Sequence, residues 1–452
     1  MREGSLEAPI RHPIDWQNPD FTDTEKLDAE VRRVFDICHG CRRCFNLCDS
    51  FPRLFDLVDN SPSNELDTVE SKDFKPVVDA CTLCDMCFMT KCPYVPPHEF
   101  NLDFPHLMLR YRVAERAKGI GPGLIEDQLT KTDRNGKLAS LAPGLANWGS
   151  RRGNGLTRPV LAGVAHVHPD AELPKFHGKT FEARAAQDDV VRDMKAPAAG
   201  RKAALYATCF VNYNSPSIGD AARAILAKNG VETEVVYPQC CGMPQLEQGE
   251  IADVADRARR VASQLRLWID DGYDVIALTP SCGLMLKFEW PLIVTDDENV
   301  KKLAQSTFDI SEYIVDIAKK EGLAPGLSPV EGGVAVHLAC HARAQNMGPK
   351  AAELLRLIPD TRVTVVERCS GHGGSWGIKV ENFETALKVG RPTAKRVVDS
   401  EAAYVASECP LAGKHIVQGL EKLDALGQLK TQVALHPVEL MAKAYGMKDT
   451  KS

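Results

Sequence analysis

The chain has 452 residues, of which 44% are hydrophobic and 26% charged, and its formal net charge is −6. This composition is typical of a soluble globular protein, and the length predicts two or three domains. No apolar run approaches the roughly 18 residues of a membrane-spanning helix, and the N-terminal residues lack the apolar stretch of a secretion signal. We therefore expect a cytoplasmic protein that is at most peripheral at the inner face of a membrane.

Eight of the fifteen cysteines lie close together near the N-terminus, in two near-copies of one pattern. The first copy, CHGCRRCFNLC, runs from Cys38 to Cys48; the second, CTLCDMCFMTKC, runs from Cys81 to Cys92 and is followed by Pro93. Cysteines at two-residue intervals surround one face of a cuboidal cluster, and a fourth, more distant cysteine followed by proline is the bacterial ferredoxin signature. The array predicts two 4Fe-4S clusters, and hence a role in moving electrons.

Other roles for these cysteines are less well supported. A structural zinc site usually takes two pairs of cysteines and has no need of the third cysteine found in each copy. Disulfides are disfavoured in the reducing compartment expected here. A free cysteine is often only a small buried hydrophobe, but chance does not produce eight at this spacing.

The division of these cysteines between two clusters follows from two-cluster ferredoxins, in which the fourth cysteine of each run ligates the other cluster. The expected ligands are Cys38, Cys41, Cys44 and Cys92 for the first cluster, and Cys81, Cys84, Cys87 and Cys48 for the second. The sequence departs from the pattern twice. Asp49 rather than proline follows Cys48, and four residues instead of three separate Cys87 from Cys92. Both departures affect how the fourth ligand is presented, and neither removes a ligand.

Charge is unevenly distributed around this array. Between Asp49 and Asp85 there are nine acidic and three basic residues. They are interpreted as a solvated linker or as a docking face for a basic redox partner. A basic patch follows within an apolar stretch, which indicates either an ordinary amphipathic helix or a surface for a membrane or partner. Its basic residues are Arg110, Arg112, Arg116 and Lys118.

The chain is expected to divide into four parts. Residues 20–118 should form short helices around the cysteine runs. Residues 119–201 are rich in Gly, Pro, Ala and Asn with weak apolar periodicity, which predicts an extended connecting segment that wraps another domain. An internal repeat follows, with its two copies at residues 202–325 and 330–445. No flavin or nicotinamide fingerprint is evident, since GIGPG at 119–123 follows no predicted strand.

Each copy of the repeat reads as strand, helix, strand, helix and strand. The predicted strands cover 203–209, 231–237 and 274–278 in the first copy, and 334–338, 362–366 and 403–407 in the second. The predicted helices cover about 218–228, 250–270 and 350–357, and a last one runs to about 400. A cysteine lies at or soon after the end of each strand, and corresponding cysteines are 131, 129 and 127 residues apart. This alternation predicts parallel sheets covered by helices, with the cysteines beyond the carboxyl ends of the strands.

The cysteines of the first copy, Cys209, Cys240-Cys241-Gly242 and Cys282, resemble those of the cysteine-rich CCG domain. The duplicated pair behind a two-cluster ferredoxin module is similar to a group of iron–sulfur proteins. The group includes heterodisulfide reductase catalytic subunits, the C subunit of anaerobic glycerol-3-phosphate dehydrogenase, and the iron–sulfur subunits of glycolate and lactate oxidation. Residues 33–57 are further similar to a rubrerythrin-associated branch. The resemblance implies an α+β multidomain fold, with an α-helical ferredoxin-like domain carrying two 4Fe-4S clusters before duplicated α/β CCG domains.

The family's full motif has five cysteines, which in heterodisulfide reductase hold a non-cubane 4Fe-4S cluster that cleaves disulfides. The first copy keeps Cys209, Cys240, Cys241 and Cys282 but has Met285 in place of the last cysteine. A thioether is a poor replacement for a thiolate, so core packing is the expected role of Met285. The four thiolates predict a third iron–sulfur cluster, with zinc or a purely structural site as alternatives.

The second copy has lost more of the motif. It keeps Cys340, Cys369 and Cys409, while Ser370 and Ala412 replace the other two cysteines. Histidines lie beside the survivors, and a site for zinc or a modified cluster is one interpretation. Hydrogen bonding within turns is the other. The candidate ligands are Cys340, Cys369, Cys409, His341 and His372, and His337 also flanks Cys340.

These features favour an iron–sulfur electron-transfer subunit of an oxidoreductase. Electrons would come from a partner, a flavoprotein dehydrogenase or a rubrerythrin-like protein, and would pass to a quinone or a thiol/disulfide acceptor. The second hypothesis is a heterodisulfide reductase-like catalytic subunit that reduces disulfides or peroxides at the first CCG site. The third is a zinc-stabilised interaction scaffold. No catalytic residue is assigned, and no nucleic-acid partner is expected.

Overall fold

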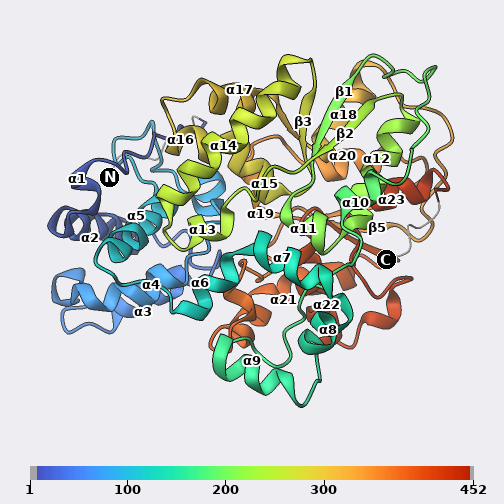
Figure 1. The fold of residues 1–452 in the computed structure, drawn as a ribbon. Coiled ribbons are helices and arrows are strands. Elements are labelled where there is room, and N and C mark those ends of the chain that lie inside the picture. The colour runs from blue at the N-terminus through green and yellow to red at the C-terminus, as the bar shows by residue number, and fades with distance from the viewer. Residues whose placement is uncertain (1–7, 448–452) are drawn as a thin grey trace.

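The computed structural model describes residues 8–447 (Figure 1). Its first part is helical, as expected. Short helices and turns surround the two cysteine runs, and aromatic side chains such as Phe35, Phe55 and Phe74 fill the space between them. Its α-helices are α1 (Pro19–Thr22), α2 (Thr24–Cys41), α3 (Ser50–Asp59), α4 (Lys75–Asp79) and α5 (Phe104–Ala117).

The first copy of the repeat is a four-stranded parallel sheet in the order β2-β1-β3-β4. The strands are β1 (Lys202–Tyr206), β2 (Glu232–Val236), β3 (Asp274–Ala277) and β4 (Thr307–Asp309). Residues 203–206 of β1 and 275–277 of β3 are buried, as expected for a parallel sheet covered on both faces. The main covering helices are α12 (Pro216–Lys228), α14 (Ile251–Asp270), α17 (Glu298–Ser306) and α18 (Ile310–Lys320).

The second copy is a three-stranded parallel sheet in the order β6-β5-β7. Its strands are β5 (Val334–His337), β6 (Val363–Val366) and β7 (Tyr404–Ser407). Its main helices are α20 (Lys350–Arg356), α21 (Phe383–Asp399), α22 (Pro410–Lys422) and α23 (Pro437–Ala444). All the strands and helices predicted for the repeat are present, so that prediction is confirmed, while β4 was not foreseen.

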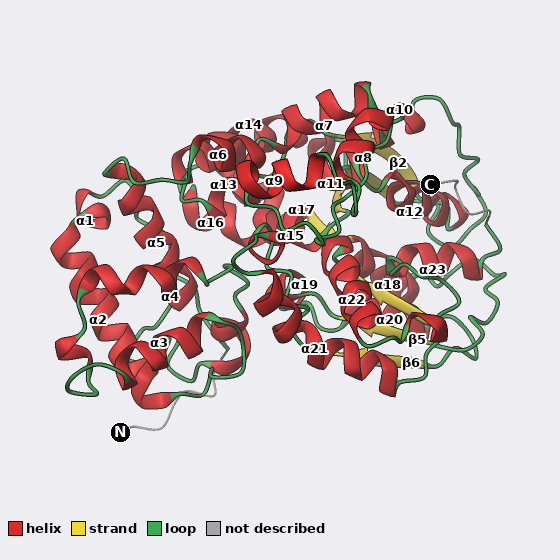
Figure 2. Ribbon diagram, turned by 90° about the horizontal axis from the view of Figure 1, so that it is seen from below, coloured by secondary structure: helices red, strands yellow, loops and turns green. Residues whose placement is uncertain are grey.

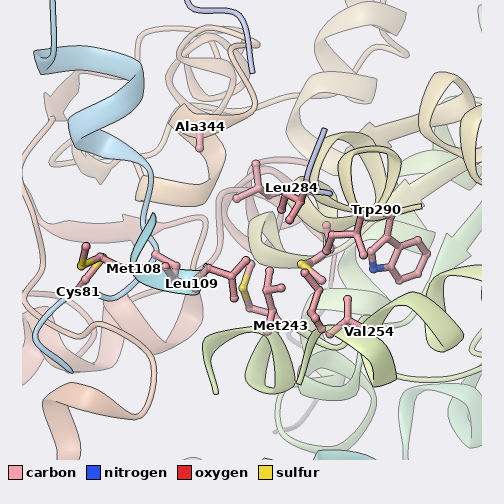
Figure 3. Close-up of a cluster of buried hydrophobic side chains, with 14 of the residues drawn as sticks. Cys81, Met108, Leu109, Met243, Val254, Leu284, Trp290 and Ala344 are labelled. Atoms are coloured by element: carbon pink, nitrogen blue, oxygen red, sulfur yellow. The ribbon is translucent and has the colours of Figure 1, made fainter. Parts of the chain in front are cut away.

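Two hydrophobic clusters join the parts of the molecule. One runs from the N-terminal helices into the first copy, and Figure 3 shows Cys81, Met108 and Leu109 in line with Met243 and Trp290 of that copy. The other is shared by the two copies. It is formed largely where α12 contacts α23 and where α18 contacts α20. The two sheets, seen as separate groups of strands in Figure 2, are therefore held in a fixed relation.

The N-terminal arm crosses from one part to the other. The backbone of Ile14 bonds to Leu292 at 2.8 Å, and the indole of Trp16 donates to the carbonyl of Ile293 at 2.9 Å. Arg11 is largely buried and pairs with Asp85 at 2.7 Å, Asp103 at 2.8 Å and Glu289 at 3.0 Å. Asp85 lies inside the second cysteine run and Glu289 belongs to the first copy, so one guanidinium links the two.

The connecting segment corrects one expectation. Residues 119–201 were predicted to be extended, but much of the segment is helical. Its Pro and Gly residues mark short helices rather than a strap, because proline fits the first turn of a helix. The helices are α6 (Leu124–Thr130), α7 (Thr132–Leu141), α8 (Pro143–Ser150), α9 (Thr157–Ala165) and α10 (Phe181–Ala185). Within residues 8–447, no helix is long and apolar enough to cross a membrane.

Candidate functional site

The N-terminal cysteines neighbour one another in two groups, one around Cys38 and one around Cys48. The pKa of Cys38 is raised first by burial and then by the charges of Cys92, Cys44 and Cys41, so these four lie together. The thiols of the second group are likewise close to one another. The pKa of Cys48 is raised first by burial and then by Cys84 and Cys81, and the pKa of Cys87 responds to the same two thiols.

The extra residue before Cys92 is absorbed by a change of helix type. Cys87–Lys91 form a single π turn, and the backbone N–H of Cys92 donates to the carbonyl of Cys87 at 2.8 Å. A π turn closes over one residue more than an α turn. The four-residue spacer therefore still brings Cys92 to the first group, and the departure from the ferredoxin spacing has a local structural explanation.

In the first copy of the repeat, four cysteines meet beyond the carboxyl ends of the strands. Cys209 follows β1 and begins α11 (Cys209–Tyr213), Cys240 and Cys241 follow β2, and Cys282 follows β3 in α15 (Pro280–Leu284). The sulfurs form two close pairs, Cys209–Cys240 at 3.7 Å and Cys241–Cys282 at 3.2 Å. Met285 is fully buried in the core, consistent with packing as its role.

The pKa of Cys240 is lowered well below that of an ordinary thiol. Hydrogen bonds from Cys209 and Cys241 to its sulfur are the largest causes, and the Thr132 hydroxyl adds a further one at 3.3 Å. The pKa values of Cys209 and Cys241 are raised correspondingly. Among Cys209, Cys240 and Cys241, these hydrogen bonds therefore favour the thiolate form at Cys240.

The connecting segment contributes to this site, which the sequence did not indicate. Besides Thr132, the carboxylate of Asp133 accepts from the backbone N–H of Cys240 at 3.0 Å, and it also bonds to the Tyr237 hydroxyl. Both residues begin α7. Thr132 is 108 residues from Cys240 in the chain, so no local pattern could have revealed the contact.

The second copy places its cysteines beside the N-terminal array. Cys340 begins α19 (Cys340–Ala344), and Cys409 caps α22. The pKa of Cys340 is raised first by burial and then by Cys84, Cys369 and Cys409. The three remaining cysteines are thus brought together, and they adjoin the second predicted cluster through Cys84.

The histidines of the second copy have different surroundings. Both ring nitrogens of His341 have partners, the Ser281 hydroxyl at 2.9 Å and the carbonyl of Leu83 at 3.3 Å. His337 is also bonded through both nitrogens, to Ser407 and to the carbonyl of Arg368, each at 3.0 Å. These contacts match the hydrogen-bonding interpretation. His372 instead lines a cavity, and burial lowers its pKa to about 3.

A cavity of about 1080 Å³ lies between the two copies. All four cysteines of the first site line it, and His372 and Cys409 of the second copy line it as well. Apolar residues of α6 and α9 form part of its wall. The Gly-rich loop 371–377 borders it and packs closely on Thr82 and Glu247.

Comparison with known proteins identifies the repeat. The cysteine-rich domain CCG matches the chain at residues 203–287 and again at residues 334–415. The chain contains two copies of this domain. The two matched segments contain all seven C-terminal cysteines and most of both sheets, so the cavity lies between two CCG domains.

Similar proteins include subunits of oxidoreductases. The C subunit of anaerobic glycerol-3-phosphate dehydrogenase from Escherichia coli K12 is 26% identical over 299 residues, covering 64% of this chain and 69% of that protein. The B subunit of the fumarate reductase (CoM/CoB) of Methanothermobacter marburgensis is 29% identical over 252 residues, covering 54% and 47%. Lactate utilization protein A of Bacillus cereus is 27% identical over 189 residues, covering 40% and 75%. These relatives support an iron–sulfur role in electron transfer.

One acidic residue at the cavity between the CCG domains was missed by the sequence analysis. Glu247 ends α13 (Met243–Glu247), and its carboxylate faces the backbone of Gly374. Burial raises its pKa to about 7, against a smaller opposing effect of Arg112. A carboxyl group with this pKa can hold or release a proton near neutral pH.

Proposed function

We propose that this CCG-domain protein is the iron–sulfur electron-transfer subunit of an oxidoreductase. It relays electrons through two 4Fe-4S clusters from a partner, a flavoprotein dehydrogenase or a rubrerythrin-like protein. The acceptor is a quinone or a thiol/disulfide compound bound between the CCG domains. The observation that carries the proposal is the unbroken succession of thiol groups from the N-terminal array to the cavity.

The succession can be followed residue by residue. Cys44 of the first group lies close enough to Cys87 of the second to affect its pKa. Cys84 of the second group is in turn a neighbour of Cys369 and Cys340. Cys340 is a neighbour of Cys409, which lines the cavity. The cysteine sets fit 4Fe-4S clusters, which supply one-electron transfer when bound.

The residues that line the cavity suit the binding of a small electron acceptor. Its apolar wall excludes water, and a few polar groups converge on it, which is typical of small-molecule sites. Reduction of a quinone or a disulfide takes up two electrons and two protons. Glu247 is placed to deliver one of those protons, while Ser281 and His372 are available to orient the acceptor.

The arrangement of ligands bears on the zinc alternative. Ligands of a single zinc ion converge on one point, whereas the thiolates of a 4Fe-4S cluster are spread over its irons. Within residues 8–447, no three or more His, Cys, Asp or Glu side chains converge in a way that would hold one ion. The sulfur pairs in the first CCG domain, at 3.7 Å and 3.2 Å, do not distinguish zinc from a cluster, so metal analysis decides between them.

A second function is favoured by one specific observation. The lowered pKa of Cys240 makes it a nucleophilic thiolate at the cavity wall, and thiolates attack disulfides. Direct disulfide reduction at this site is the alternative to simple relay. A Cys240→Ser variant separates the two, because unchanged disulfide reduction in that variant excludes attack by this thiolate at the first CCG site.

Metal analysis after anaerobic purification tests the main proposal. Two clusters require about eight irons with equal sulfide, and a third cluster raises the count to about twelve. About eight irons with stoichiometric zinc would indicate two relay clusters and a structural zinc. A protein that binds no iron under these conditions excludes electron transfer through clusters.

Paired serine variants test which cysteines share a cluster. Cys48→Ser should alter the same electron paramagnetic resonance signal as Cys84→Ser, and Cys92→Ser the same signal as Cys41→Ser, because the fourth ligands cross. Each variant leaves the other signal as the internal control. If Cys48→Ser instead matches Cys41→Ser, ligation is not crossed.

A further inference from the structure

Three helices of the connecting segment contribute almost nothing to the protein core. Gly136 and Arg158 are the only fully buried residues of α7, α8 and α9. Large apolar side chains on and between the same helices are exposed instead, with fractions of 83% for Leu141, 68% for Leu145 and 74% for Leu156. The exposed set, here called the α7–α9 face, is Leu138, Leu141, Leu145, Trp148, Leu156, Val160 and Val164.

The spacing of these residues is that of helical stripes. Within single helices, Leu138 and Leu141 of α7 and Leu145 and Trp148 of α8 are three residues apart, and Val160 and Val164 of α9 are four apart. On a surface helix such a stripe normally faces the core. Here it faces away from the core, and Figure 2 shows α7, α8 and α9 together on the side of the molecule turned to the viewer.

The charged residues of this part of the chain are all basic. Residues 134–169 contain no Asp or Glu, although the whole chain has a net charge of −6. Arg158 is buried and donates to backbone carbonyls, whereas the other four basic residues are exposed. Of these four, Arg152 pairs with Glu421 of α22 at 2.6 Å. The five basic residues are Arg134, Lys137, Arg151, Arg152 and Arg158.

The α7–α9 face is continuous with the mouth of the cavity between the CCG domains. Leu124, Ile125 and Leu129 of α6 are exposed and also line the cavity, as does Val164 of α9. These side chains form an apolar path that an apolar molecule could follow from whatever covers this face into the cavity.

We propose that the α7–α9 face binds to the surface of a membrane that contains anionic lipids. Helices with leucine, valine and tryptophan on one side and lysine or arginine beside them lie in the lipid interface, with the apolar side chains among the acyl chains. Docking adds to the proposed function by supplying a lipid-soluble acceptor, but binding itself requires no cluster.

Vesicle flotation with the purified full-length protein tests this proposal. The protein should float with vesicles of phosphatidylcholine and phosphatidylglycerol, float less with phosphatidylcholine alone, and be released partly by salt. A Leu141→Ser/Leu145→Ser/Leu156→Ser variant should lower partitioning about tenfold or more. The matched control is Val191→Ser/Leu267→Ser, which removes two equally exposed apolar side chains outside the face.

A second measurement shows which part of the protein contacts the lipid. Brominated lipids should quench tryptophan fluorescence of the unaltered chain, and Trp148→Phe should remove that quenching. Absence of flotation, or flotation equal in the triple serine variant, overturns the proposal. Self-association or binding to a purified partner that depends on the same leucines, without vesicle binding, also overturns it and assigns the face to protein contact. Because cluster-free protein should float equally well, failure here is separable from failure of the electron-transfer proposal.

Discussion

At the scale of single residues, burial shifts the titration of Glu247 at the cavity between the CCG domains. Its pKa of about 7 lies above the ordinary glutamate value of 4.5 because burial disfavours the charged carboxylate. The folded state therefore binds this proton more tightly than the unfolded state does. Folding is favoured at acidic pH by this group, and that contribution is lost as pH rises from about 4.5 to about 7.

Glu247→Gln should consequently stabilise the protein at alkaline pH only. We expect a gain of about 2 kcal/mol at pH 8 and none near pH 4.5, less than the full pKa shift allows because the group faces a cavity. Thermal unfolding at both pH values measures the difference. Glu381→Gln, which alters an exposed carboxylate on the same cavity wall, is the control. Equal gains at both pH values would contradict the assigned pKa.

At the scale of elements, the Gly-rich loop 371–377 of the second CCG domain packs directly against the second cysteine run. Gly373 has a φ of +56°, and a Cβ there would lie 2.6 Å from the Cγ2 of Thr82. Thr82 stands between Cys81 and Cys84, so a displacement of this loop reaches the second predicted cluster.

Gly373→Ala should destabilise the fold by about 1–3 kcal/mol through crowding and backbone strain, and should hasten iron loss in air. Gly427→Ala is the control, because its added Cβ meets nothing within 4 Å. Combining Gly373→Ala with Thr82→Ala removes the clashing methyl, so part of the loss should be recovered. No recovery in the double variant would show that contact with Thr82 is not the cause.

The elements also show what the sequence could and could not predict. The strands of the repeat were predictable because apolar runs buried in a parallel sheet leave a clear pattern. The helices α7, α8 and α9 were not, because their apolar residues face outward and alternate with Gly and Pro. Thr132 and Asp133 were missed for another reason, since their contacts with Cys240 depend on tertiary folding. The extra residue between Cys87 and Cys92 is explained by the π turn, but the spacing alone did not predict that turn.

At the scale of the whole molecule, Arg11 links the N-terminal array to the first CCG domain. Its guanidinium bridges Asp85, Asp103 and Glu289, and it also lies 4.6 Å from the ring centre of Phe88. Removal of one member of a buried ionic group leaves the others without compensation, which is more damaging than loss of a surface ion pair.

Arg11→Met should therefore lower the free energy of unfolding by about 3 kcal/mol, since the methionine keeps part of the packing but leaves three carboxylates without their guanidinium partner. Arg266→Ala removes an exposed ion pair and should change stability by less than about 1 kcal/mol. Denaturant unfolding compares the two variants. Similar small effects would show that the arm does not hold the parts together.

The contribution of α7 to the first CCG site has a consequence for how such proteins diversify. The cysteines proposed to hold the clusters belong to one set of segments, while much of the cavity wall and the contacts of Thr132 and Asp133 with Cys240 come from another. Residues 119–201 could therefore be exchanged with those of a relative to alter acceptor preference, leaving the electronic spectra of the N-terminal array untouched. Choice of acceptor and conduction of electrons are, in this fold, separately adjustable properties.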